Sequence, residues 1–131
     1  MRKNINKIIR IVLGLALILF GLDKFFEFLP HEHVMTEEFI AAYHGLLANK
    51  FIMPTVGVVE LLSGILLVVG RWVIVALLAM IPIAFGILGF HISVDIQGIF
   101  LGALITVMLL YLLSGHFSNI GYLIKQVDAK N

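Results

Sequence analysis

The chain has 131 residues, of which 61% are hydrophobic and 13% are charged, and its formal net charge is +1. A soluble domain of this length cannot bury so large an apolar share, so we expect one membrane domain over residues 1–131, with the surplus facing lipid. The small net charge excludes an electrostatic surface for nucleic acid. The absence of cysteine excludes thiolate catalysis and cysteine-bound iron–sulfur clusters within this chain.

Four apolar segments approach the roughly 20 residues that a helix needs to cross a bilayer. They cover residues 8–29, 51–70, 72–90 and 96–113. The first follows a basic stretch, as in a signal peptide, but no small-residue cleavage site follows, so we expect an uncleaved span that Pro30 stops. Short turns at Arg71 and at residues 91–97 join the last three segments. The sequence therefore predicts an all-α, four-helix transmembrane bundle.

The only long connection lies between the first and second spans. Thr36 is a suitable N-cap, and apolar residues then recur at helical spacing from Phe39 to Leu47. This pattern predicts a short amphipathic helix over about 36–49 that lies on the membrane surface. The segment after Ser118 has a similar pattern, with Ile120, Leu123, Ile124 and Val127, which favours a second surface helix.

Lysine and arginine are distributed unevenly between the two predicted sides of the membrane. Four spans place both termini on one side, and that side carries Arg2, Lys3, Lys7, Arg10, Arg71, Lys125 and Lys130. Lys50 lies on the other side, and Lys24 lies near it at the end of the first span. Cytoplasmic loops are enriched in these cations, so both termini are expected in the cytoplasm. Small residues at Gly57, Gly64, Gly98, Gly102 and Thr106 indicate close packing between helices.

Glu60 lies near the middle of the second span, where a carboxylate costs about 2.5–3.5 kcal/mol on insertion scales. Its neighbours three and four residues away carry no cation, so its partner must come from another helix, or its carboxyl must be protonated. Two interpretations stay open. One is a structural ion pair or hydrogen bond, and the other is a role in ligand binding or proton transfer.

Lys24 is predicted at about the same membrane depth as Glu60, and His91 ends the third span on the same side of the membrane, opposite the termini. Lys24 could pair with Glu27, extend to the interface, or contact Glu60, because a rise of about 1.5 Å per residue places the two within about one turn in depth. His91 is either a solvated interfacial residue or a third member of this cluster. His31 and His33 supply only two metal ligands, so no metal site is predicted. No catalytic constellation is recognisable in the sequence.

The chain resembles the DoxX family over roughly residues 8–115. The residues that carry the resemblance are Arg10 with the following IVLGL, Gly21, Lys24, Glu60, Ser63, Gly64, Gly70, Arg71, Phe90 and His91. The resemblance implies a four-helix protein of the bacterial inner membrane. Some relatives are subunits or partners of quinone-linked oxidoreductases, including thiosulfate–quinone enzymes and thiol-stress complexes, and many have no assigned activity. It also supports Lys24, Glu60 and His91 as residues of interest.

The leading hypothesis is a membrane subunit or partner of a quinone-linked oxidoreductase. Lys24 or His91 would hydrogen-bond a quinone oxygen, and Glu60 would orient Lys24 or relay a proton. Quinone would be a non-covalent ligand, electrons would come from a partner protein, and no turnover is expected from this chain alone. One alternative is a non-catalytic scaffold or assembly protein. The other is a small proton-coupled transporter, but the absence of an inverted repeat argues against a transporter. Homo-oligomerisation stays open.

Overall fold

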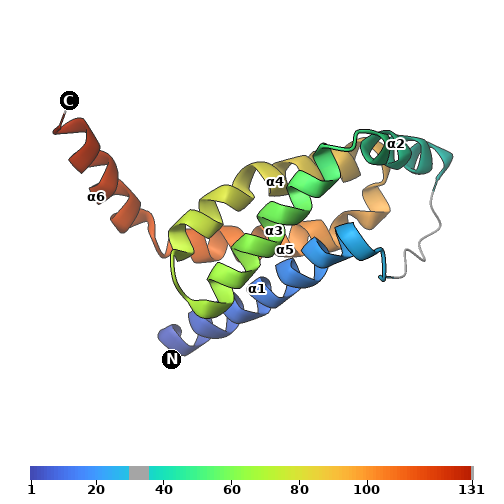
Figure 1. Cartoon of the computed structure of the whole chain (residues 1–131). Helices are drawn as coiled ribbons and strands as arrows, with labels where there is room; N and C mark the ends of the chain where they lie inside the picture. Colours follow the sequence, from blue (N-terminus) through green and yellow to red (C-terminus); the bar gives the residue numbers. More distant parts are fainter. Residues whose placement is uncertain (30–35, 131) are drawn as a thin grey trace.

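The structure is a computed structural model that describes residues 1–29 and 36–130, and every regular element in these ranges is helical (Figure 1). The elements are α1 (Arg2–Phe26), α2 (Glu37–Ala48), α3 (Ile52–Val69), α4 (Val73–Val94), the short 3-10 helix η1 (Ile96–Gly98), α5 (Ile99–Ser114) and α6 (Phe117–Asp128). Four helices are long and apolar enough to cross a membrane, namely Arg2–Phe26, Ile52–Val69, Val73–Val94 and the continuous Ile96–Ser114. The predicted all-α, four-span architecture is confirmed.

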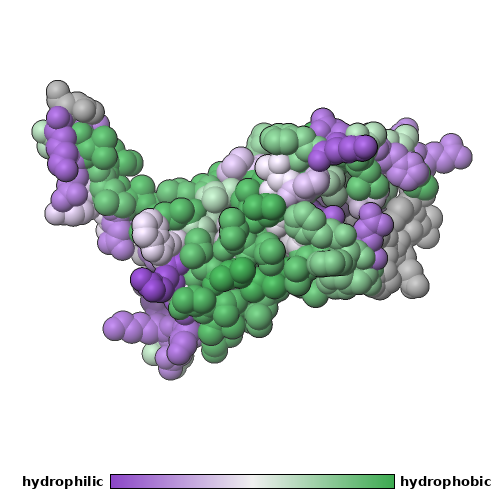
Figure 2. All heavy atoms as spheres, viewed as in Figure 1, coloured by the Kyte–Doolittle hydropathy of each residue, from purple (hydrophilic) through white to green (hydrophobic). Residues whose placement is uncertain are grey.

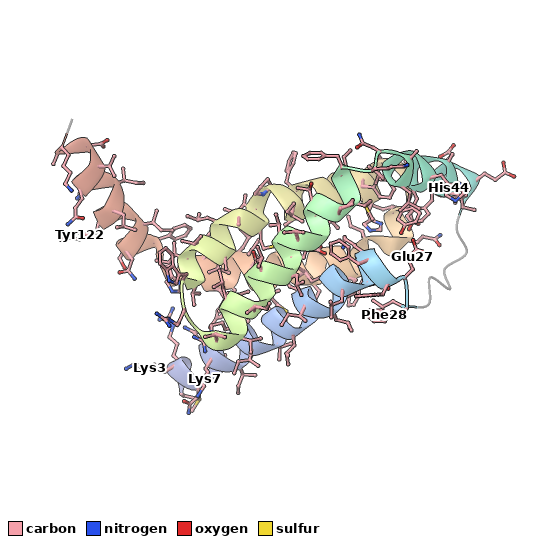
Figure 3. All side chains as sticks on the ribbon, in the orientation of Figure 1. Lys3, Lys7, Glu27, Phe28, His44 and Tyr122 are labelled. Carbon is pink, nitrogen blue, oxygen red and sulfur yellow. The ribbon has the colours of Figure 1, made fainter. Side chains whose placement is uncertain are left out.

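The four spans form a closed ring. α1 packs on α3, α3 on α4, α4 on α5, and α5 returns to α1. Figure 2 shows a hydrophobic surface over the ring, with hydrophilic residues gathered toward its two ends. We call the end that carries the N-terminus and α6 the terminal end, and the end that carries α2 the α2 end. In Figure 3, Lys3 and Lys7 lie at the terminal end, whereas Glu27 and His44 lie at the α2 end.

Asp23 ends the first span earlier than the sequence suggested. α1 stops at Phe26 rather than Leu29, and Glu27 adopts a left-handed conformation with φ 48°. The backbone N–H of Leu29 donates to Asp23 Oδ1 at 2.7 Å, so the turn is closed by a side chain from within the helix. The helix thus ends three residues before the expected limit near Leu29, and Pro30, which was expected to stop the span, lies outside the described residues.

The connections on either side of α4 differ from each other. Gly70, with φ 78°, and Trp72, with φ 55°, form the predicted tight turn between α3 and α4. Between α4 and α5, however, helical structure continues to Val94, so most of the predicted turn over 91–97 is absent and His91 lies within the helix. Asp95 alone interrupts the backbone before η1 begins. His91 consequently lies on a span rather than on a loop.

Glycines bring α1 and α3 into close contact. A Cβ atom built on Gly64 would lie 2.6 Å from the carbonyl oxygen of Gly14, and one on Gly21 would lie 2.9 Å from that of Gly57. Gly14 and Gly21 are seven residues apart in α1, and Gly57 and Gly64 are seven residues apart in α3. The two antiparallel backbones therefore meet at two successive points. The close packing predicted for Gly57 and Gly64 is confirmed, and their partners are the glycines of α1.

The two halves of the ring are filled differently. The half toward the terminal end holds the hydrophobic core, to which all four spans contribute. Its buried residues are Leu13, Leu17, Leu67, Ala76, Leu77, Met80, Ala84, Ile105, Leu109, Leu112 and Leu113. The half toward the α2 end instead contains a cavity, which α2 covers through contacts with α3 and α4.

α2 forms where the sequence predicted it. The Thr36 side chain accepts a hydrogen bond from the backbone N–H of Phe39 at 3.2 Å, so this residue is the N-cap of the helix. None of its residues is fully buried, as expected of a helix at a surface. Its position on a membrane surface stays a prediction.

Candidate functional site

A cavity of about 460 Å³ lies inside the ring near the α2 end. Its walls are mostly apolar, and they come from the four spans, α2 and the Asp95 turn. The lining residues are Phe20, Lys24, Phe39, Tyr43, Leu46, Ile52, Met53, Val56, Glu60, Pro82, Ile83, Gly86, Ile87, Phe90, His91, Asp95, Gly98, Leu101, Gly102 and Ile105. All three site residues predicted from the sequence, Lys24, Glu60 and His91, therefore line one space.

Lys24 and Glu60 form an ion pair between α1 and α3. Lys24 Nζ lies 2.5 Å from Glu60 Oε2, and it also donates to the carbonyl oxygen of Phe20 at 3.5 Å. Glu60 is only 2% exposed, so its charge depends on this pairing because burial removes hydration. The contact predicted from membrane depth is confirmed, and Glu60 points into the bundle.

The glycine contact between the helices positions this pair. Lys24 follows Gly21 by three residues, and Glu60 follows Gly57 by three, so in these antiparallel helices the two residues lie about one turn to either side of the backbone contact. A Cβ on Gly57 would lie 3.1 Å from the Cβ of Lys24. The small residues thus bring the stem of Lys24 against α3, from where its ammonium group reaches the carboxylate.

His91 faces the cavity from α4, which lies diagonally across the ring from α1. Its Nδ1 atom is buried and has no hydrogen-bond partner among the residues that the structure describes. The nearest carboxylate oxygen, Asp95 Oδ2, is 3.7 Å away, which is too long for a hydrogen bond. The imidazole is held by aromatic rings instead, at centroid distances of 6.3 Å from Phe39 and 5.8 Å from Phe90.

α2 contributes Phe39 and Tyr43 to the cavity wall, although the sequence pattern indicated them only as part of an apolar helix face. Phe39 packs on both Phe90 and His91, and the Thr36 hydroxyl donates to the carbonyl oxygen of Val94 at 3.4 Å. Tyr43 lies one turn further along α2 and also lines the cavity. Burial raises the pKa of the Tyr43 phenol, and the carboxylates of Glu27 and Asp23 raise it further. The phenol therefore keeps its proton at neutral pH and can donate a hydrogen bond.

The other histidines lie away from this cavity. His44 is exposed on α2, and His116 contacts the carbonyl oxygen of Leu112 at 2.9 Å near the terminal end. His31 and His33, together with Glu32, lie outside the described residues. Within the described ranges, no group of three or more metal-ligating side chains is close enough to hold an ion.

Comparison with known protein families gives a match over most of the chain. The family model described as DoxX matches residues 5–92, which include Lys24, Glu60 and His91. The match ends within α4, so α5 lies outside it although the sequence resemblance extended to about residue 115. No curated protein and no solved structure matches the chain. Because the family model covers more than half of its length, this multi-span membrane protein belongs to the DoxX family.

Proposed function

We propose that the cavity binds the head group of a quinone and that the protein is a small membrane subunit of a quinone-linked oxidoreductase system. The observation that carries this proposal is a buried Lys24–Glu60 ion pair that opens onto an apolar cavity between membrane spans. An ionisable pair is costly inside a membrane, and such groups commonly mark ligand or proton pathways. The redox role rests in addition on the family to which the chain belongs.

The chemistry of a quinone matches the cavity wall. A quinone has a flat ring with two carbonyl oxygens and a long apolar tail, so it needs a few donors in a hydrophobic enclosure. Lys24 on α1, His91 on α4 and Tyr43 on α2 supply donors from different sides, while aliphatic and aromatic residues form the rest of the wall. The volume of about 460 Å³ falls within the roughly 300–1,000 Å³ typical of small-molecule sites.

Each polar residue has a distinct part in this proposal. The Lys24 ammonium donates to one quinone oxygen, and Glu60 holds that ammonium in place through its 2.5 Å contact. Proton transfer to a reduced quinone needs a nearby acid–base group, and Glu60 or His91 can serve. The electrons come from a partner protein, so the chain binds the quinone and does not turn it over alone.

A scaffold role is the second candidate, and one observation favours it. The Lys24–Glu60 pair lies beside the closest contact between α1 and α3, where it could serve only to fix the packing of the two helices. In that case the cavity would hold lipid or detergent without selectivity, and the protein would act by assembling partners.

The two candidates differ in quinone affinity. Purified protein in detergent should bind a soluble benzoquinone or naphthoquinone analogue, as measured by isothermal titration calorimetry. Glu60→Gln and Lys24→Met should each weaken binding at least tenfold, with helix content unchanged by circular dichroism. Tyr43→Phe should cause a smaller loss because it removes one neutral donor.

Matched controls use exposed residues of the same type near the α2 end. Glu38→Gln and Lys50→Met remove the same charges outside the cavity and should leave the affinity unchanged. If the parent protein shows no binding, or if the cavity variants bind as well as the controls, the scaffold candidate replaces the quinone proposal.

A further inference from the structure

α6 stands apart from the ring at the terminal end. Figure 1 shows it leaving α5 and running across the direction of the spans rather than along them. None of its residues is buried, and Leu123, Ile124 and Val127 are each more than half exposed. A helix with this much exposed apolar surface needs an apolar environment outside the ring.

The apolar residues of α6 lie on one side of the helix. At 100° per residue, Ile120, Leu123, Ile124 and Val127 fall on one face, and Ser118, Tyr122 and Lys125 fall on the opposite face. Figure 2 shows hydrophobic residues along the edge of α6 that faces the ring and hydrophilic residues along its far edge. Tyr122 is on the far side, pointing away from the bundle (Figure 3).

An apolar groove of about 300 Å³ separates α6 from α4. Its α4 wall is formed by Ile74 and Leu78, in the first two turns of a membrane span, and Leu78 is exposed on the outside of the ring. Its α6 wall is the apolar face just described, together with Asp128 at the end of the helix. The groove therefore lies beside the first turns of a candidate membrane span, and α6 covers it from the terminal side.

We propose that α6 lies in the membrane–water interface at the terminal end and that acyl chains of anionic phospholipids occupy the groove between α6 and α4. The apolar face of α6 and the lipid-facing side of α4 then border one hydrocarbon layer. Cations at this end complement anionic head groups, and they are Arg2, Lys3, Lys7, Arg10, Arg71, Lys125 and Lys130. A docked protein would have to displace lipid from the side of a span, so lipid is the occupant that fits this place.

The lack of native cysteine allows each position of α6 to be tested alone. Leu123→Cys and Ile124→Cys place a spin label on the apolar face, and Ser118→Cys places the matched control on the polar face. Each full-length variant is labelled and reconstituted in nanodiscs of phosphatidylethanolamine and phosphatidylglycerol. Electron paramagnetic resonance then measures collision of the label with oxygen, which concentrates in lipid, and with a water-soluble nickel complex.

We expect the label at residues 123 and 124 to be more accessible to oxygen than to the nickel complex, and the label at residue 118 to show the reverse. In nanodiscs of phosphatidylcholine alone, the oxygen preference at 123 and 124 should fall by at least half because the anionic head groups are missing. If labels on both faces of α6 collide mainly with the nickel complex, the helix lies in water, and this result would overturn the proposal. Low accessibility to both reagents at 123 and 124 would mean that protein covers this face, and it would overturn the proposal equally. An oxygen preference that does not change in phosphatidylcholine would overturn the assignment to anionic lipid.

Discussion

The two halves of the ring are made by the same four helices, yet one is solid and the other is hollow. Toward the terminal end, Leu13, Leu17 and Leu77 are at most 1% exposed and fill the centre. Toward the α2 end, the centre is a cavity of about 460 Å³ that exposes an ion pair. The solid half therefore holds the helices together through its apolar core, whereas the hollow half presents polar groups to a cavity.

One difference lies in the residues that α4 supplies to the two halves. In the solid half α4 contributes Leu77 and Met80, whereas in the hollow half it contributes Gly86 to the wall. A Cβ atom built on Gly86 would meet no heavy atom within 4 Å. Gly98 of η1 and Gly102 of α5 also line the cavity, but there the space is already taken, because a Cβ on Gly102 would lie 2.9 Å from Ile87 Cγ2 and one on Gly98 would clash with the Asp95 carboxylate. Among these glycines, Gly86 is therefore the one beside which space is left.

The first prediction assigns each half to a side of the membrane. Seven lysines and arginines belong to the terminal side, so this end should be cytoplasmic and the hollow half should face outward. Alkaline phosphatase, which is active only outside the cytoplasm, should be inactive when fused after Asn131 and active when fused at Asn49. Green fluorescent protein at the same positions should give the complementary pattern. The reverse result for both reporters would place the cavity on the cytoplasmic side.

The second prediction concerns the ion pair in the hollow half. Lys24→Met or Glu60→Gln alone should lower the free energy of unfolding by about 3–5 kcal/mol, since each disrupts a buried pair. The double variant should lose clearly less than the sum of the two single losses, because no unpaired charge remains. Unfolding by sodium dodecyl sulfate in mixed micelles measures all four proteins. Strictly additive losses would contradict an energetic coupling between the two residues.

The third prediction compares one methyl group in the two halves. Gly64→Ala should destabilise the protein by about 1–3 kcal/mol, because its Cβ would lie 2.6 Å from the carbonyl oxygen of Gly14 and force α1 away from α3. Gly86→Ala in the hollow half meets no such atom and should be neutral or stabilising by up to about 1 kcal/mol. The same unfolding titration measures both variants. Equal losses at the two positions would show that Gly86 is packed as tightly as Gly64.

The sequence alone determined the number of spans, the cap of α2 and the residues worth examining. Four long apolar runs can be stable only as membrane helices, because their backbone groups must bond internally. The Thr36 cap followed from local chemistry, since a hydroxyl before a helix accepts from the third residue along. The pairing of Lys24 with Glu60 followed from depth, because rise per residue fixes height within a bilayer.

Only the tertiary structure decided which faces meet and where space is left. Asp23 ends α1 through a bond to Leu29, and α4 continues beyond His91, although the apolar pattern suggested other limits. In a membrane span almost every residue is apolar, so hydropathy does not distinguish the lipid-facing side from the inward one. Tyr43 on α2 and the cavity that it lines could be recognised only once the helices were assembled, because a cavity depends on side-chain volumes contributed by segments far apart in the chain.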